Sequence, residues 1–142
     1  MESQRHRYWA HALGRICLGV NIFLHGLVRI PSFPQFADHL QHQFQKSFLP
    51  PPAVLASAYF IVAAETLVGF LVLIGLGTRP ALIAGTLVML FLQIGSALIQ
   101  DWSIAGQQLV YIAFYVGLLA TVQYDYLSID SWRRAHRPIP PM

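Results

Sequence analysis

The 142-residue sequence contains few charged residues. Only 11% of its residues are Asp, Glu, Lys or Arg, whereas soluble domains average about 25%. Hydrophobic residues make up 56%, and the mean hydropathy is +0.53. These values exclude an ordinary soluble domain and indicate a membrane protein. The net charge of +3 does not indicate nucleic-acid binding, because the basic residues lie mainly near the two chain ends and form no basic helix face.

Residues that bind metals or cofactors are also scarce. The single cysteine, Cys17, can form neither an intramolecular disulfide nor a CxxC pair, and its apolar surroundings predict a packing role. His11 and His25 lie in the same hydrophobic segment, about 21 Å apart along a helix, so this chain alone should not hold a bis-histidine haem. No phosphate-binding loop, dinucleotide motif or nucleophile elbow occurs. We therefore expect no metal site and no cofactor bound by this chain alone.

Four hydrophobic segments are long enough to cross a membrane, since about 20 helical residues span the hydrocarbon core. The connections after the second and third segments are short, which predicts antiparallel neighbours. No small-residue cleavage site follows the first segment, so we expect it to be retained. The expected fold is all-α, an integral membrane four-helix bundle in one domain over residues 8–132. The predicted spans are about residues 9–30, 53–76, 81–99 and 108–124.

Arginines predict the orientation of this bundle. Outside the predicted spans they occur in two basic tails, residues 1–7 and 133–142, and at Arg79 in the turn after the second span. Four spans place all three regions on one side, and the positive-inside rule makes that side cytoplasmic. Residues 31–52 then lie outside. Four-residue spacing there predicts a short amphipathic helix, which either closes the loop or acts as a lid or docking face. Its apolar positions are Phe36, Leu40, Phe44 and Phe48.

Two ionisable residues lie deep in the predicted spans. A charged side chain at this depth costs about 2.5–3.5 kcal/mol on insertion scales and normally finds a partner. Counted from the outer ends of their spans, Arg15 and Glu65 differ in height by about 5 Å. This predicts an Arg15–Glu65 ion pair near the middle of the membrane. The alternative is that Arg15 reaches toward the cytoplasm and Glu65 is protonated.

Polar residues at helical spacing form stripes in the predicted outer half of the membrane. One interpretation is helix packing through interhelical hydrogen bonds, worth about 0.6 kcal/mol each. The other is a small polar pocket for a redox head group such as a quinone ring, because His and Tyr can donate to its carbonyl oxygens. The candidate pocket residues are Asn21, His25, Arg29, Gln93, Tyr111 and Tyr115.

Several stretches together point to a family. GRICLGVNIFLHGLVRI contains Arg-x-x-x-Gly, then His-Gly and a basic residue. The stretch from PPPAVLASAYF to GLGTRP predicts a helix that begins with prolines, contains Ala-Glu and ends in a Gly-x-x-Thr-Arg turn. The third predicted helix is apolar, with polar residues near its end. The stretch YDYLSIDSW contains a tyrosine followed by Ser-x-Asp. Over about residues 10–132 the sequence resembles the DoxX/DoxD-like family of small four-helix bacterial membrane proteins. The resemblance implies that five positions match the family pattern: Arg15, His25, Arg29, Glu65 and Arg79. Arg29 stands where a lysine is common in the family.

The resemblance implies a multi-pass protein of the bacterial cytoplasmic membrane. A DoxD-type member is a membrane subunit of a thiosulfate:quinone oxidoreductase, and other members resemble accessory subunits of redox or oxidative-stress assemblies. The first hypothesis is therefore a redox-complex membrane subunit, with the lipid bilayer and an oxidoreductase subunit or a second copy as partners. The second is a non-catalytic anchor or assembly subunit. The third is a small proton-coupled exporter, which a paired Glu65 disfavours because the pairing holds it ionised. Enzymatic activity of the chain itself stays open.

Overall fold

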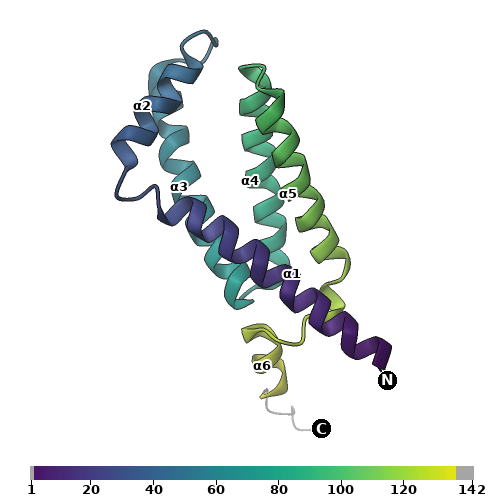
Figure 1. Ribbon diagram of the computed structural model, residues 1–142. Helices are drawn as coiled ribbons and strands as arrows, with labels where there is room; N and C mark the ends of the chain where they lie inside the picture. The colour runs from purple at the N-terminus through teal and green to yellow at the C-terminus, as the bar shows by residue number, and fades with distance from the viewer. Residues whose placement is uncertain (1, 137–142) are drawn as a thin grey trace, which may run out of the picture.

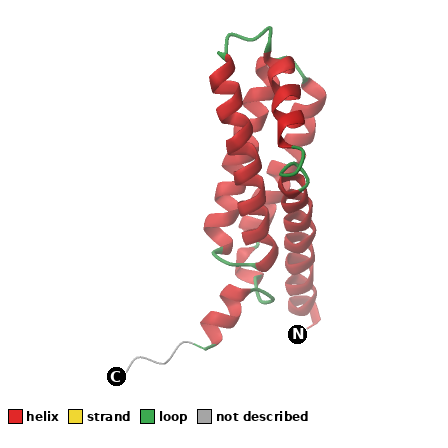
Figure 2. Ribbon diagram, turned by 90° about the vertical axis from the view of Figure 1, so that its left-hand side faces the viewer, coloured by secondary structure: helices red, strands yellow, loops and turns green. Residues whose placement is uncertain are grey.

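The computed structural model describes residues 2–136, and this range is all-α with no strands. Four helices are long and apolar enough to cross a membrane. These findings confirm the prediction of an all-α chain with four helices that could span a membrane. Figure 2 shows the helices forming an elongated bundle. The elements are α1 (Glu2–Leu27), α2 (Phe33–Phe44), α3 (Pro51–Ile74), α4 (Thr78–Leu98), α5 (Trp102–Ala120), the 3-10 helix η1 (Val122–Tyr124) and α6 (Ile129–Ala135).

The two chain ends share one end of the bundle. Figure 1 shows the N-terminus, the α3–α4 turn and α6 together there, and the α4–α5 connection at the opposite end. We call these the α6 end and the α2 end. The predicted tail 1–7 is largely part of α1, which already begins at Glu2. Residues 137–142 of the other tail, Arg137 included, lie outside the described residues. The cytoplasmic location of the α6 end stays a prediction from the arginines.

Helix α1 packs most closely against α3. Gly69 of α3 faces the backbone of Phe23, and Gly19 of α1 faces the backbone of Leu73. A Cβ atom at either glycine would clash with backbone atoms of the opposite helix. Small residues allow such close backbone approach between membrane helices. Gly26 lies beside Thr66 in the same way, so three contacts fix the antiparallel register of α1 and α3.

We expect Gly69→Ala to destabilise the protein by about 1–2 kcal/mol, because the added methyl group forces α1 and α3 apart. Thermal unfolding in detergent micelles measures the effect. Gly117→Ala is the matched control, since a Cβ there meets no atom within 4 Å. Equal stability of the two variants would contradict the close α1–α3 contact.

Helix α2 lies in the connection between α1 and α3, as predicted from the four-residue spacing. It packs against α3 near the α2 end of the bundle (Figure 1). The Phe33 ring contacts the Tyr59 ring of α3, with centroids 4.3 Å apart, and Ala37 is buried. Helix α2 therefore extends the bundle along α3 and forms part of its wall.

Candidate functional site

A cavity of about 620 Å³ lies toward the α2 end of the bundle. Helices α1 to α5 all contribute to its wall. Most of the lining is apolar, including Ile22, Ile61 and Met89. Polar side chains occur among these apolar residues. They are His25, Arg29, His39, Gln43, Ser57, Glu65, Ser96, Gln107, Gln108 and Tyr111.

An ion pair between Arg29 and Glu65 lies in the cavity wall. Arg29, just after α1, donates from Nη1 to Oε2 of Glu65 in α3. The Arg29 guanidinium also lies over the ring of Phe36 in α2, 4.7 Å from its centroid. The Glu65 side chain is 4% exposed and that of Arg29 is 27% exposed. Arg29 thus connects the end of α1 with α2 and with the interior of α3 around the cavity.

A second polar group joins α1 to α5. The hydroxyl of Tyr111 donates to Oδ1 of Asn21 over 3.1 Å, and the His25 ring lies edge-on to the Tyr111 ring with centroids 6.4 Å apart. Nearer the α2 end, the Ser96 hydroxyl donates to Oε1 of Gln108 over 3.2 Å. The cavity therefore combines hydroxyl, imidazole, amide and ion-pair groups within an apolar wall.

Three of the six candidate pocket residues line this cavity, and a fourth contacts one of them. His25, Arg29 and Tyr111 line it, and Asn21 is linked to it through Tyr111. Gln93 is half-buried but is not part of the lining. Tyr115 is completely buried one turn away from Tyr111, where its ring packs on Gly85 of α4.

The structure corrects the predicted Arg15–Glu65 ion pair, because Glu65 bonds to Arg29. The α1–α3 register explains the difference: it places Glu65 opposite Leu27 and Arg15 opposite the α3–α4 turn. The two residues are therefore about 18 Å apart along the bundle, too far for an arginine side chain to cover. The prediction assumed that the outer ends of the first two spans lie at the same height. In the structure α1 already ends at Leu27, opposite Glu65, and α2 continues along α3 beyond that point.

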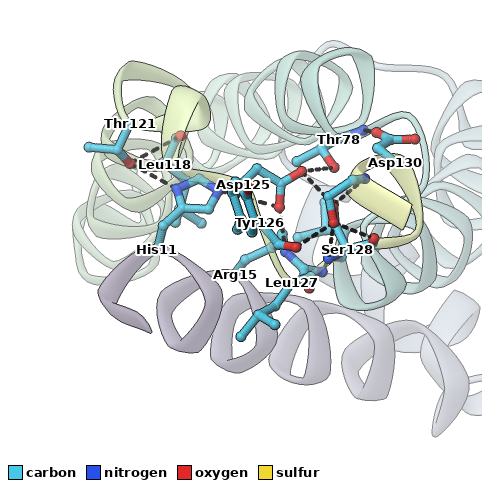
Figure 3. Close-up of polar contacts among 12 residues, drawn as sticks. His11, Arg15, Thr78, Leu118, Thr121, Asp125, Tyr126, Leu127, Ser128 and Asp130 are labelled. Carbon is cyan, nitrogen blue, oxygen red and sulfur yellow. Dashed lines mark hydrogen bonds and ion pairs between the residues drawn. The ribbon is translucent and has the colours of Figure 1, made fainter. Parts of the chain in front are cut away.

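Arg15 instead organises a buried polar cluster at the α6 end (Figure 3). Its guanidinium donates to the carbonyl oxygens of Val72 and Leu73, both at 2.7 Å, and to that of Leu127 at 2.5 Å. The first two are among the last carbonyl groups of α3, which lack partners within the helix. Arg15 therefore caps α3 and attaches the segment after α5 to α1.

Asp125 is the acidic residue of this cluster. Its Oδ1 lies 3.6 Å from Nε of Arg15 and 4.0 Å from Nε2 of His11. Its Oδ2 accepts hydrogen bonds from the hydroxyl groups of Thr78 at 3.0 Å and Ser128 at 2.8 Å. The sequence analysis did not identify Asp125, because it follows the last predicted span. The feature of the sequence that could have identified Asp125 is its place in the motif YDYLSIDSW.

Asp130 caps a helix that is distant in the sequence. Its carboxylate accepts hydrogen bonds from the backbone N–H groups of Gly77 at 3.0 Å and Thr78 at 2.7 Å, at the start of α4. Partial burial opposes the charged form, but these hydrogen bonds outweigh burial and hold the pKa of Asp130 below its usual value of 3.8. The Ser-x-Asp motif thus has a structural role, with Ser128 and Asp130 both binding near the α3–α4 turn.

A lowered pKa means that Asp130 stabilises the folded state while it is ionised. This contribution is present above pH 3.8 and is lost as the pH falls through the lowered pKa. We expect Asp130→Asn to be less stable than wild type at pH 7, and the difference to shrink below pH 3.8. Thermal unfolding of both proteins across this range measures it. A difference that does not change with pH would contradict the ionised cap.

Comparison with known proteins adds one finding to this geometry. The family model described as DoxX matches residues 10–98. The chain belongs to the DoxX family. The match contains Arg15, His25, Arg29 and Glu65, whereas the resemblance in the sequence extended to about residue 132. No match was found among curated proteins or among solved structures.

The DoxX match covers only part of the two polar regions. It includes the α1 to α4 walls of the cavity and ends before α5, which contributes Tyr111 and Gln108. It also ends before Asp125 and Asp130. Over residues 2–136, no group of three or more His, Cys, Asp or Glu side chains is placed to hold a metal ion. The chemistry available at the cavity is hydrogen bonding by Tyr111 and His25 beside the Arg29–Glu65 ion pair.

Proposed function

We propose that this DoxX-family protein is a membrane subunit of a redox complex in the bacterial cytoplasmic membrane, and that its cavity binds the head group of a quinone. The observation that carries the proposal is the cavity itself, where His25, Tyr111, Arg29 and Glu65 meet inside an apolar wall. Small-molecule sites are typically mainly apolar, with a few convergent polar groups, and have volumes of about 300–1,000 Å³.

The lining suits the chemistry of a quinone. A quinone ring is flat and largely apolar, and its carbonyl oxygens accept hydrogen bonds. The His25 imidazole can supply one donor, and the Tyr111 hydroxyl can supply another by exchanging its bond to Asn21 for one to the quinone oxygen. The Arg29 guanidinium binds Glu65 through Nη1 and lies over the Phe36 ring, and its other N–H groups are further donors in the wall. Tyr111 and His25 would therefore orient the head group.

The electron donor would belong to a partner subunit. The sequence has one cysteine, and iron–sulfur clusters are held mainly by several cysteine thiolates. The described apolar helices also leave surfaces for contact with lipid or a partner helix, as on α5, where Leu109, Val110 and Phe114 are exposed. A partner that carries the redox centre, with this chain holding it at the membrane, fits both observations.

The interhelical hydrogen bonds favour one alternative, a non-catalytic anchor or assembly subunit. The Tyr111–Asn21 and Ser96–Gln108 bonds would stabilise helix packing in an anchor as well. The exporter hypothesis receives less support. Glu65 is paired with Arg29, so a cationic substrate would have to displace the guanidinium to reach the carboxylate.

The test is quinone-linked electron transfer by the complex purified through a tag on this chain. We expect His25→Ala and Tyr111→Phe to lower the rate at least about tenfold while the partner still co-purifies, as removal of a catalytic hydrogen bond commonly does. His6→Ala and Tyr59→Phe are the controls, because both residues are exposed and away from this cavity. Wild-type rates in the cavity variants would overturn the quinone proposal. Loss of assembly alone would favour the anchor.

A further inference from the structure

The segment after α5 exposes apolar side chains at the α6 end. Tyr126 is 68% exposed and Trp132 is 62% exposed, and Leu127 and Ile129 are exposed as well. Helix α6 has only seven residues, far too few to cross a membrane. It begins beside the α3–α4 turn and projects from the bundle (Figures 1 and 2). We call these four residues, together with Arg79 and Arg133, the aromatic–basic surface.

Several hydrogen bonds fix this surface at the end of the spans. The Asp130 carboxylate binds the first N–H groups of α4, and the Asp130 N–H donates to the carbonyl oxygen of Gly75 over 3.0 Å. Ser128 binds Asp125, which lies against Arg15. The surface is thus held where α3 and α4 would leave the hydrocarbon core, at the depth of lipid head groups.

The charge at this end of the bundle is predominantly positive. Arg79 and Arg133 are exposed, as are Arg5 and Arg7 of α1. The acidic side chains of the neighbouring C-terminal segment, Asp125 and Asp130, accept internal hydrogen bonds and do not face these arginines as free carboxylates. Exposed aromatic rings beside exposed arginines fit a membrane interface with negatively charged head groups better than they fit water.

We propose that the aromatic–basic surface binds anionic phospholipid head groups of the membrane leaflet at the α6 end. Trp132 and Tyr126 would lie at the head-group level, where their rings are partly apolar and partly hydrated. Arg79 and Arg133 would contact the phosphates. The proposal is independent of the cavity and of the quinone hypothesis. It gives the C-terminal segment a lipid-binding role beyond its contacts within the bundle.

A single-tryptophan protein tests this contact. Trp9 and Trp102 are exposed, so replacing both with phenylalanine leaves Trp132 as the only tryptophan without opening a buried site. The full chain is reconstituted in phosphatidylcholine vesicles that contain an equal minor fraction of brominated phosphatidylglycerol or brominated phosphatidylcholine. We expect brominated phosphatidylglycerol to quench Trp132 at least about twofold more strongly, because head-group charge concentrates the anionic lipid near arginines.

The controls separate charge from simple contact with lipid. Arg79→Gln together with Arg133→Gln should remove the preference, whereas Lys46→Gln, which removes an exposed positive charge far from α6 in the connection after α2, should retain it. Equal quenching by the two lipids would overturn the proposal. Absence of quenching by either lipid would also overturn it, because that result is expected if the surface faces water or a protein partner. With all tryptophans present, the arginine variant should also retain less phosphatidylglycerol in native mass spectrometry.

Discussion

Asp125→Ala is expected to destabilise the protein by about 3–5 kcal/mol, the usual cost of removing one partner from a buried charge pair. The side chains of Asp125 and Arg15 are 3% and 2% exposed. Without the carboxylate, the Arg15 charge keeps only backbone carbonyl partners, and the Thr78 and Ser128 hydroxyls lose their acceptor. The free energy of unfolding in mixed detergent micelles measures the effect.

Asp38→Ala is the matched control for this experiment. Asp38 is exposed on α2, so its replacement should change the stability by no more than about 0.5 kcal/mol. Asp125→Asn should fall between the two, because the amide oxygen can still accept from Thr78 or Ser128. If Asp125→Ala were as mild as Asp38→Ala, the buried cluster at the α6 end would not be holding the C-terminal segment.

Arg29→Met is expected to cost about 2–3 kcal/mol, because it leaves the buried Glu65 carboxylate without its cationic partner. The Arg29→Met/Glu65→Met double variant should recover part of this loss, since two apolar side chains leave no unpaired charge. A double-mutant cycle in the same micelle assay gives their coupling energy, which we expect to exceed about 1 kcal/mol.

A second cycle provides the control for that coupling. Arg15 and Glu65 are separated by about 18 Å in the α1–α3 register, so their replacements should add within about 0.5 kcal/mol. Strong coupling of Arg15 with Glu65, and none of Arg29 with Glu65, would restore the ion pair expected from the sequence and contradict the register.

Hydropathy and connection lengths were sufficient to predict the spans. Long apolar segments joined by short turns leave few arrangements other than antiparallel neighbours, and the structure has four such helices. The relative heights of α1 and α3 were not predictable in the same way. They depend on the close contacts at Gly19 and Gly69, and hydropathy does not indicate which glycines face a backbone.

The cavity was predictable only where helical spacing matched the helix contacts. His25 and Arg29, four residues apart, both line it. On α4 the lining extends from Met89 to Leu98 and includes both neighbours of Gln93, Leu92 and Ile94, but not Gln93 itself. Tyr115 is one turn from Tyr111, but Gly85 leaves room for its ring between α4 and α5. Such contacts between helices cannot be deduced from one sequence.

The residues at the α6 end were missed for a different reason. Asp125 and Asp130 lie after the last span, where the sequence analysis identified the motif YDYLSIDSW but assigned these residues no partners. Both carboxylates bind the start of α4, more than 45 residues earlier in the chain. Capping of a helix by a residue so distant in the sequence produces no hydrophobic periodicity that could predict it. The Ser-x-Asp motif nevertheless pointed to Asp130.

The most direct test of the central claim is photo-crosslinking of a short-chain azidoquinone to the purified protein, with peptide mapping of the labelled residues. Our account predicts label on the cavity lining, in the peptides that contain His25 and Tyr111, and its loss when an unmodified quinone competes. Label spread over the lipid-facing positions of all four long helices, without competition, would contradict a quinone site in this cavity.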